Sequence, residues 1–108
     1  MTDELWRGEY PIQSNFLELD EGNRLHYVDE GSGSPVLMVH GNPTWSFYYR
    51  HLVQSLQDRY RAIAVDHVGC GLSSKPQRYP YTLTQHIQNL TLLVEHLELD
   101  GVHLVVHD

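Results

Sequence analysis

The sequence has little cysteine, few positive charges and no long apolar run, and each absence argues against a class of protein. Its single cysteine, Cys70, cannot form an internal disulfide. Seven Lys and Arg residues stand against 14 Asp and Glu residues, and the net charge of −7 argues against binding to nucleic-acid phosphates or an anionic membrane surface. No run of about 18 apolar residues occurs, and the first residues lack the basic and apolar regions of a secretory signal. We therefore expect a cytoplasmic protein that binds neither nucleic acid nor membrane.

Cofactor signatures are also missing. Eight histidines suggest a metal site, but neither CxxC nor HExxH spacing occurs. The closest pair, His103 and His107, falls in a strand-like run, where this separation spans about 13 Å at ~3.3 Å per residue. The segment Asp66–Ser73 contains two glycines of a dinucleotide-binding loop, but Ser74 stands where a third glycine is needed. We expect no metal and no nucleotide cofactor, and we interpret this loop as structural.

The chain is short for the pattern that it carries. At 108 residues it can form at most one small domain, and an α/β domain of three layers normally needs more residues to cover both faces of its sheet. The composition is that of an ordinary globular protein, with 41% hydrophobic residues. The length therefore favours a part of a larger fold.

Strand patterns occur five times along the chain. Phe16–Leu19 and Arg24–Val28 flank a turn that contains Gly and Asn, which predicts an antiparallel hairpin. A continuous apolar run follows at Pro35–Val39, and similar apolar runs follow at Ala62–Val65 and, with His103 inside it, at Val102–Val106, as is typical of strands buried in a parallel sheet. The runs alternate with helical patterns, so the sequence predicts an α/β fold: a mostly parallel sheet with a leading antiparallel hairpin and flanking helices.

Two helices are predicted between these strands. The apolar stripe of the first comprises Trp45, Tyr49, Leu52, Val53 and Leu56. The second begins at Thr82, which forms a capping-box pattern with Gln85. Its apolar stripe comprises Leu83, Ile87, Leu90, Val94 and Leu97.

Polar and glycine-containing segments follow the predicted parallel strands, at the sheet edge where such folds gather their reactive groups. The first segment is HGNPTW, His40–Trp45. Gly41 permits close backbone approach, Pro43 stiffens the turn, and Asn42 provides a neutral side-chain donor beside exposed backbone amides. The alternative is a plain helix entry, capped by Asn42 or Thr44.

Asp108 follows the last apolar run. A carboxylate at the end of a buried strand is costly unless it is hydrogen-bonded, paired or reactive. The alternative is an Asp that caps a following helix, which is a common role for Asp after a strand. Taken alone, the position favours neither interpretation.

Three segments, taken in this order, resemble the haloalkane dehalogenases and their epoxide-hydrolase relatives within the α/β-hydrolase fold. They are HGNPTW, the D-x-x-G-x-G-x-S run at Asp66–Ser73, and VVHD at Val105–Asp108. The resemblance extends over essentially the whole chain. It implies that residues 1–108 form one partial α/β-hydrolase core domain, with the cap domain and the C-terminal half outside this sequence. The catalytic His would also lie outside it, so we expect the 108-residue chain alone to be inactive.

The resemblance also implies roles for individual residues. Asp108 corresponds to the nucleophile, and Asn42 to the side-chain donor for the departing halide and one amide of the oxyanion hole. His40, Gly41, Pro43 and His107 would support these two residues. The implied reaction is attack by the carboxylate on an sp³ carbon, followed by hydrolysis of the alkyl-enzyme ester, and it needs no metal or organic cofactor.

The substrate class stays open among small apolar organic molecules. Epoxide hydrolases tend to carry an apolar residue between HG and P, so Asn42 favours a haloalkane dehalogenase. The run HGNPTWSFYYR, His40–Arg50, also resembles the β-lactone decarboxylases of bacterial olefin biosynthesis, which are the nearest alternative. A non-catalytic hydrolase-fold binding module is the alternative from another class, and the presence of both Asn42 and Asp108 argues against it.

Overall fold

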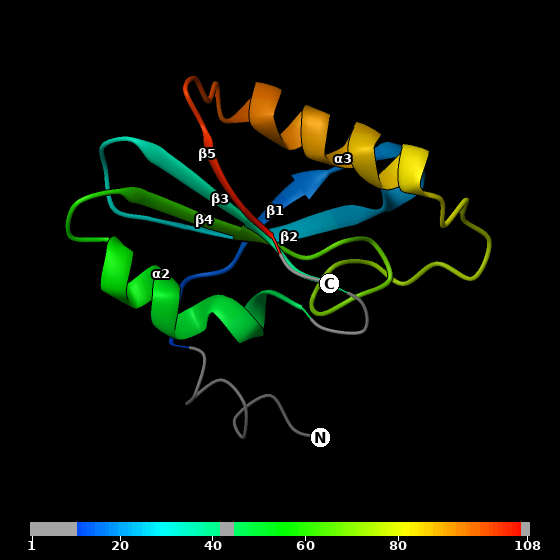
Figure 1. Ribbon diagram of the computed structural model, residues 1–108. Coiled ribbons are helices and arrows are strands. Elements are labelled where there is room, and N and C mark those ends of the chain that lie inside the picture. Colours follow the sequence, from blue (N-terminus) through cyan, green and yellow to red (C-terminus); the bar gives the residue numbers. More distant parts are fainter. Residues whose placement is uncertain (1–10, 42–44, 107–108) are drawn as a thin grey trace.

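The computed structural model describes residues 11–41 and 45–106. Five strands form one sheet in the order β1-β2-β4-β3-β5 (Figure 1). The strands are β1 (Asn15–Glu18), β2 (Arg24–Glu30), β3 (Pro35–Val39), β4 (Arg61–Val65) and β5 (His103–Val106). β1 and β2 are antiparallel, β2 also pairs antiparallel with β4, and β3 pairs in parallel with both β4 and β5. The predicted partial α/β-hydrolase fold, with its leading hairpin, is confirmed.

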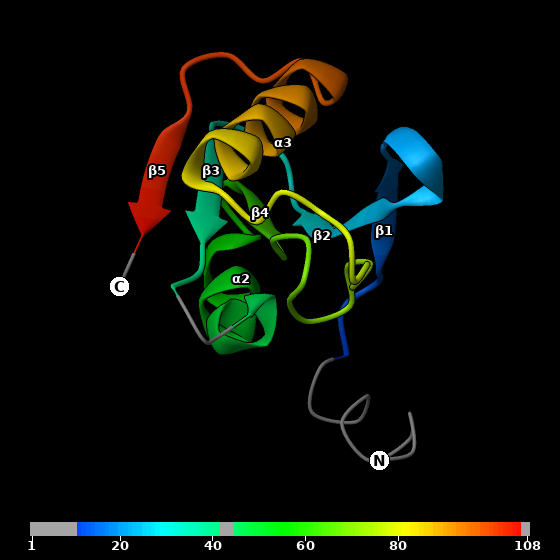
Figure 2. The same cartoon turned by 90° about the vertical axis from the view of Figure 1, so that its right-hand side faces the viewer.

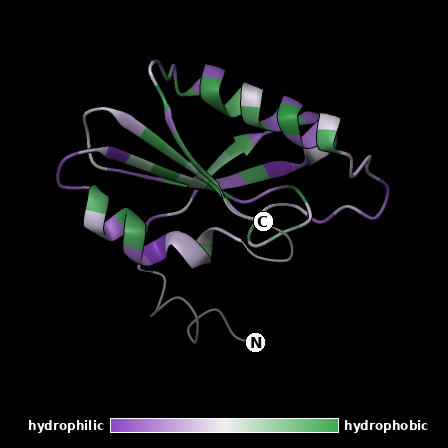
Figure 3. Cartoon of the chain, viewed as in Figure 1, coloured by the Kyte–Doolittle hydropathy of each residue, from purple (hydrophilic) through white to green (hydrophobic). Residues whose placement is uncertain are grey.

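One helix covers each face of the sheet (Figure 2). A 3-10 turn, η2 (Ser46–Tyr49), leads directly into α2 (Arg50–Leu56), and α3 (Leu83–His96) lies on the opposite face. Successive side chains of a strand point to opposite faces, so β3 contributes Val36 and Met38 to the core beneath α2, and Leu37 and Val39 to the core beneath α3. Figure 3 shows the hydrophobic residues gathered on the strands and on parts of both helices.

The central strands are buried as predicted, but β5 is not. Ala62 to Val65 of β4 are completely buried, because strands lie on both sides and a helix covers each face. In β5, Leu104 is 62% exposed and Val106 is 59% exposed. The prediction of a buried last strand is therefore wrong for the described structure. The physical reason is that β5 pairs with β3 on one side only.

The first predicted apolar stripe agrees with the structure in part. Tyr49 and Val53 are buried against the sheet, and Trp45 and Leu56 pack against the same core. Leu52 is 38% exposed. The segment also begins as a 3-10 turn, η2, with about 3.0 residues per turn. The α-helical spacing assumed for the predicted stripe therefore does not hold along the whole segment.

The predicted start of α3 is confirmed, whereas its buried face is shifted from the prediction. Thr82 is the N-cap, and its Oγ1 accepts a hydrogen bond from the Gln85 amide at 3.1 Å. The first two members of the stripe, Leu83 and Ile87, are exposed. Asn89 is buried instead, since its side chain donates to the Tyr79 hydroxyl. The apolar stripe does not include Asn89, because an apolar pattern cannot identify a polar residue that is buried with a hydrogen-bond partner.

Candidate active site

The candidate site lies at the carboxyl edge of β3, β4 and β5. β3 and β5 are adjacent and parallel, and Val39 is paired with Val106. The segments that follow these two strands contain the predicted site residues. Among these, His40 and Gly41 are described by the structure, whereas Asn42, Pro43, His107 and Asp108 lie outside the described residues.

His40 links the end of β3 to the segment after β4. Its side chain is buried, with 4% exposure. Nδ1 lies 2.6 Å from the Gly41 carbonyl oxygen, and Nε2 accepts a hydrogen bond from the His67 backbone N–H at 3.0 Å. A carbonyl only accepts and an amide only donates, so this pattern requires the tautomer with the proton on Nδ1. The His40 ring therefore has one defined orientation relative to the Gly41 carbonyl.

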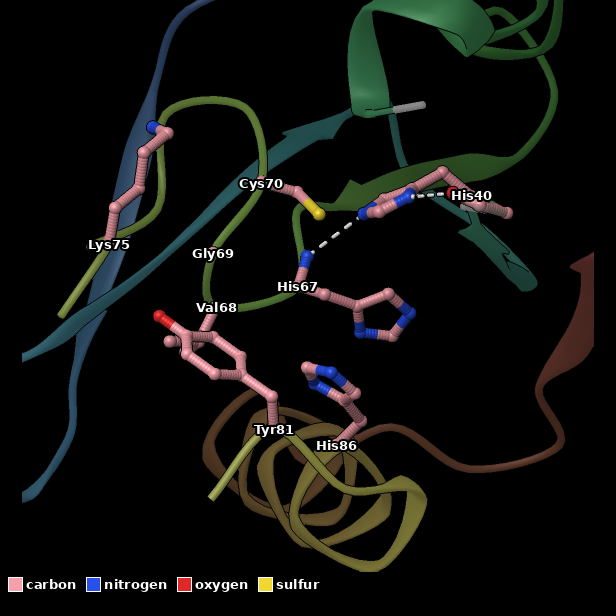
Figure 4. Close-up of a pocket in the computed structure, with 9 residues that line it drawn as sticks. His40, His67, Val68, Gly69, Cys70, Lys75, Tyr81 and His86 are labelled. Carbon is pink, nitrogen blue, oxygen red and sulfur yellow. Dashed lines mark hydrogen bonds between the residues drawn. The ribbon is translucent and has the colours of Figure 1, made fainter. Parts of the chain in front are cut away.

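A pocket of about 510 Å³ opens at this edge, between the segment after β4 and the first turns of α3 (Figure 4). It is lined by His40, Gly41, His67, Val68, Gly69, Cys70, Lys75, Tyr81 and His86. The His67 ring packs against the His40 ring on one side and the His86 ring on the other, with centroid distances of 4.6 Å in both cases. Three imidazole rings from three separate elements therefore meet in one pocket.

Three titratable side chains of the pocket, His67, His86 and Cys70, favour their neutral forms. Burial, followed by the nearby His40 and His86 rings, lowers the pKa of His67 to about 4. Burial and His40 also lower the pKa of His86, and burial raises the pKa of the Cys70 thiol. Lys75 directs its ammonium group to the backbone carbonyls of Gly71 and Ser73. The pocket wall is thus suited to an uncharged, largely apolar ligand near neutral pH.

Asp66, at the end of β4, organises the backbone around the pocket. The side chain is completely buried, and its Oδ2 lies 2.8 Å from His26 Nδ1. The Ser46 amide donates to Oδ1 at 2.5 Å, and the Leu72 amide donates to Oδ2 at 3.0 Å. One carboxylate therefore holds the start of η2, the segment after β4 and the middle of β2 together.

The same hydrogen bonds keep Asp66 ionised. Burial raises the pKa of this carboxyl, but the hydrogen bond and charge of His26 and the two backbone amides outweigh burial, and the pKa is lowered. Ser73 also connects the loop to β2 and to the end of β4. Its hydroxyl donates a hydrogen bond to the Asp66 carbonyl and accepts one from the His26 amide. The loop over Asp66–Ser73 is thus bonded to the sheet at several points.

Sequence reasoning missed three residues of this arrangement: His26, His67 and His86. Little in the sequence indicated them, because each is a single histidine outside any motif of catalytic or metal-binding residues. His26 stands between the apolar residues Leu25 and Tyr27 in β2, where simple alternation would place it on the solvent side, yet it is buried. The convergence of His67 and His86 on His40 depends on the order of strands in the sheet.

Neither a metal-binding cluster nor a helix that could cross a membrane occurs among residues 11–41 and 45–106. No three His, Cys, Asp or Glu side chains there are arranged to hold one ion. Both ring nitrogens of His40 are already engaged with backbone groups. No helix in those ranges combines the length and the apolar character of a membrane span.

Comparison with known proteins places this arrangement in a family. Residues 34–108 match the family described as alpha/beta hydrolase fold. The chain is 52% identical over 101 residues to a cis-3-alkyl-4-alkyloxetan-2-one decarboxylase of Shewanella oneidensis, a match that covers 91% of this chain and 31% of the relative. It is 46% identical over 91 residues to haloalkane dehalogenase 2 of Mycobacterium bovis, covering 84% of this chain and 32% of the relative.

A solved structure agrees with these matches. The haloalkane dehalogenase DpaA of Paraglaciecola agarilytica superposes with a TM-score of 0.86 and 36% sequence identity, over 93% of this chain and 36% of that chain. The chain thus spans about a third of the length of the curated relatives that it matches. Its sheet order, its strand-end motifs and the family match lead to one assignment. This chain belongs to the α/β-hydrolase fold family.

Proposed function

We propose that this chain is part of a longer enzyme in which Asp108 is a nucleophile and Asn42 binds the group that leaves. The observation that supports this most directly is the parallel pairing of β3 with β5, Val39 with Val106. Neighbouring strands lie about 4.8 Å apart, so the two segments that follow them start side by side at the same edge. A carboxylate from one segment and a donor from the other can then reach one small molecule.

The proposed first step is displacement at an sp³ carbon. A carboxylate oxygen of Asp108 forms a C–O bond, and the bond from that carbon to the leaving group breaks with its electron pair. Asn42 stabilises the negative charge that develops on the leaving group. The product is an ester of Asp108, which still contains a carbonyl and therefore remains reactive in a second step.

The second step distinguishes the substrates. For a haloalkane, water attacks the ester carbonyl, and an alcohol is released together with the free carboxylate; the base for this water would lie outside residues 1–108. For a β-lactone, opening at the sp³ ring carbon leaves a carboxylate on the neighbouring carbon. Loss of carbon dioxide then forms the alkene and expels Asp108, so this route needs no water.

We favour a β-lactone as the substrate, with a haloalkane as the second candidate. The chain is 52% identical to a relative named as a decarboxylase of such lactones and 46% identical to one named as a dehalogenase. The extended segment His40–Arg50 had already indicated this alternative. The pocket wall is largely uncharged, because Lys75 turns its ammonium group to backbone carbonyls, and it is compatible with either substrate, since both are uncharged. A cytoplasmic location and the absence of a cofactor stay predictions from the sequence.

The experiment uses the full-length protein and follows two reactions side by side. Release of carbon dioxide and alkene from a cis-β-lactone is compared with halide release from a bromoalkane. Decarboxylation that far exceeds halide release supports the favoured substrate, and the reverse supports a dehalogenase. Opening of an epoxide to a diol, with neither of these reactions, would show that Asn42 does not distinguish this protein from an epoxide hydrolase. Binding of such molecules without any turnover would favour the non-catalytic module.

A further inference from the structure

A second chain of hydrogen-bonded side chains lies at the same end of the sheet, outside the pocket. Ser14 directly precedes β1, His26 belongs to β2 and Asp66 directly follows β4, and these three strands are neighbours in the sheet (Figure 1). The Ser14 hydroxyl oxygen lies 2.9 Å from His26 Nε2, and His26 Nδ1 lies 2.8 Å from Asp66 Oδ2. The mechanism proposed for Asp108 uses none of them. Their geometry is that of a hydroxyl, a base and an acid that orients the base.

The bonds of His26 define which of its nitrogens can take up a proton. Hydrogen bonds outweigh burial and lower the pKa of the Asp66 carboxyl, so this group is ionised near neutral pH and only accepts hydrogen bonds. In the neutral imidazole, Nδ1 must therefore carry the proton that faces Asp66, and Nε2 has the free lone pair. Ser14 is then the donor in its bond to Nε2. The ring is placed to accept the Ser14 proton, and the ionised Asp66 stabilises the imidazolium that results.

The three side chains differ in burial in the way that an activated hydroxyl requires. His26 and Asp66 are completely buried, whereas Ser14 is only partly buried. The Phe16 ring packs against the His26 ring with a centroid distance of 5.3 Å, and the Ser73 hydroxyl accepts a hydrogen bond from the His26 amide at 2.7 Å. The base and the acid are thus fixed and shielded from water, while the hydroxyl can be reached from solution.

We propose that Ser14 is an acylation site, at which the hydroxyl, activated by His26 and Asp66, reacts with activated esters and with β-lactones. The Ser14 oxygen forms a bond to the carbonyl carbon of the reagent, and its proton passes to His26 Nε2. The acyl C–O bond of the reagent breaks, and its oxygen leaves with the electron pair and takes up a proton. A β-lactone ring opens in this step, and all its atoms stay on Ser14. The inference does not depend on the proposed function, because Asp108 takes no part.

The burial of His26 also indicates what happens to the acyl group. Hydrolysis of an ester on Ser14 needs a water molecule that is activated by His26 Nε2. This nitrogen belongs to a completely buried residue and lies behind Ser14, so the acyl group itself blocks the approach of water. We therefore expect a single, lasting modification of Ser14 rather than repeated turnover.

The test compares two serines in the same molecule. The full-length protein is incubated with p-nitrophenyl acetate, and peptide mass spectrometry follows acetylation at Ser14 and at Ser55, an exposed serine of α2 that serves as the control. Because a positioned base accelerates such a reaction by about a hundredfold or more, Ser14 should be acetylated at least about a hundredfold faster than Ser55. In His26→Gln, which lacks the base, the rate at Ser14 should fall to about that at Ser55.

A β-lactone separates this site from the one proposed for Asp108. Acylation of Ser14 adds the mass of the whole lactone to the protein, whereas attack by Asp108 at the sp³ carbon ends in release of carbon dioxide. In Asp108→Ala, the added mass at Ser14 should remain. Loss of turnover without loss of this labelling would overturn the proposed function alone.

Three outcomes would overturn the inference. The first is equal acetylation of Ser14 and Ser55 in the wild-type protein. The second is a folded His26→Gln variant in which Ser14 reacts as fast as in wild type. If this variant does not fold, imidazole ¹⁵N chemical shifts of the wild-type protein decide instead: an unprotonated His26 Nε2 under the labelling conditions supports the inference, and a protonated one is the third outcome against it.

Discussion

Two aspartates follow parallel strands in the sequence, Asp66 after β4 and Asp108 after β5, and only Asp66 lies within the described residues. Asp66 accepts hydrogen bonds from His26, Ser46 and Leu72, so three of its roughly four acceptor positions are occupied and its pKa is lowered. Such a carboxylate is held in place and is a poor nucleophile. Asp108 comes two positions after the last residue of β5 in the sequence, and it is the carboxylate that we propose as reactive. Position at a strand end alone does not distinguish the two roles.

At the residue scale, Asp108 and Asn42 should differ in kind when replaced. Asp108→Ala removes the atom that forms the covalent bond, so turnover in the full-length protein should be abolished while the fold is retained. Asn42→Ala removes one donor to the leaving group and should leave a slow enzyme, about a hundredfold reduced in kcat, or roughly 3 kcal/mol. Single-turnover kinetics and circular dichroism check both. An unimpaired Asp108→Ala variant would refute the nucleophile assignment.

Gly71 gives a second prediction at this scale. Its φ of +50° is in the left-handed region, and an added Cβ would collide with the Asp66 carboxylate and the Trp45 ring. Gly71→Ala should therefore lower the free energy of unfolding by about 3 kcal/mol, measured by urea denaturation. Gly101→Ala is the matched control, because Gly101 has a φ of +65° and open space around it. The control should lose only about 1 kcal/mol, and equal losses in both variants would show that the collision is unimportant.

At the scale of elements, β4 and the segment after it control the site more than any helix does. Asp66 anchors η2 from one side, and the His67 amide anchors His40 from the other. α3 contributes through its first turns, where His86 reaches the pocket. The start of α3 therefore matters both for stability and for the arrangement of the imidazole rings.

The N-cap of α3 provides the prediction at this scale. Thr82→Ala removes the acceptor of the Gln85 amide and should lower the free energy of unfolding by about 1 kcal/mol. Thr84→Ala, at an exposed position within the first turn, is the control and should change it by less than about 0.5 kcal/mol. Thermal and urea denaturation measure both changes. A Thr82→Ala variant as stable as the control would mean that the cap bond is replaced by water at no cost.

At the scale of the whole molecule, the buried titratable groups predict how stability depends on pH. The pKa of His67 is lowered from 6.5 to about 4, and the pKa of His86 is lowered too. Between these values the unfolded chain binds protons that the folded chain does not, so stability must fall as the pH decreases from 6.5 towards about 4. Asp66 has a lowered pKa, so its contribution is complete above its ordinary value of 3.8 and is lost only at more acidic pH.

Urea denaturation over this pH range tests the prediction. In wild-type protein, the free energy of unfolding should decrease steadily from pH 6.5 to about 4. His67→Phe cannot take up the proton, so its curve should be flatter over the same interval. His51→Phe, at an exposed position outside the pocket, should follow the wild-type slope. Identical slopes in wild type and His67→Phe would contradict the assigned pKa.

The sequence by itself determined the features that depend on neighbouring residues. The apolar runs of β3 and β4, the hairpin of β1 and β2, and the N-cap at Thr82 all follow local rules of periodicity and capping. The motifs at the strand ends were also sufficient to indicate the α/β-hydrolase family, which the family match confirms.

Tertiary structure alone decided which distant residues meet and which faces are covered. The order β4-β3-β5 brings His40, His67 and His86 together, gives Asp66 its partners and, within residues 11–41 and 45–106, leaves one side of β5 unpaired. It also shifted the buried face of α3 onto Asn89, against the apolar pattern. The reason is physical: side-chain periodicity is set within a few residues, whereas burial and hydrogen bonding depend on packing between segments far apart in the chain.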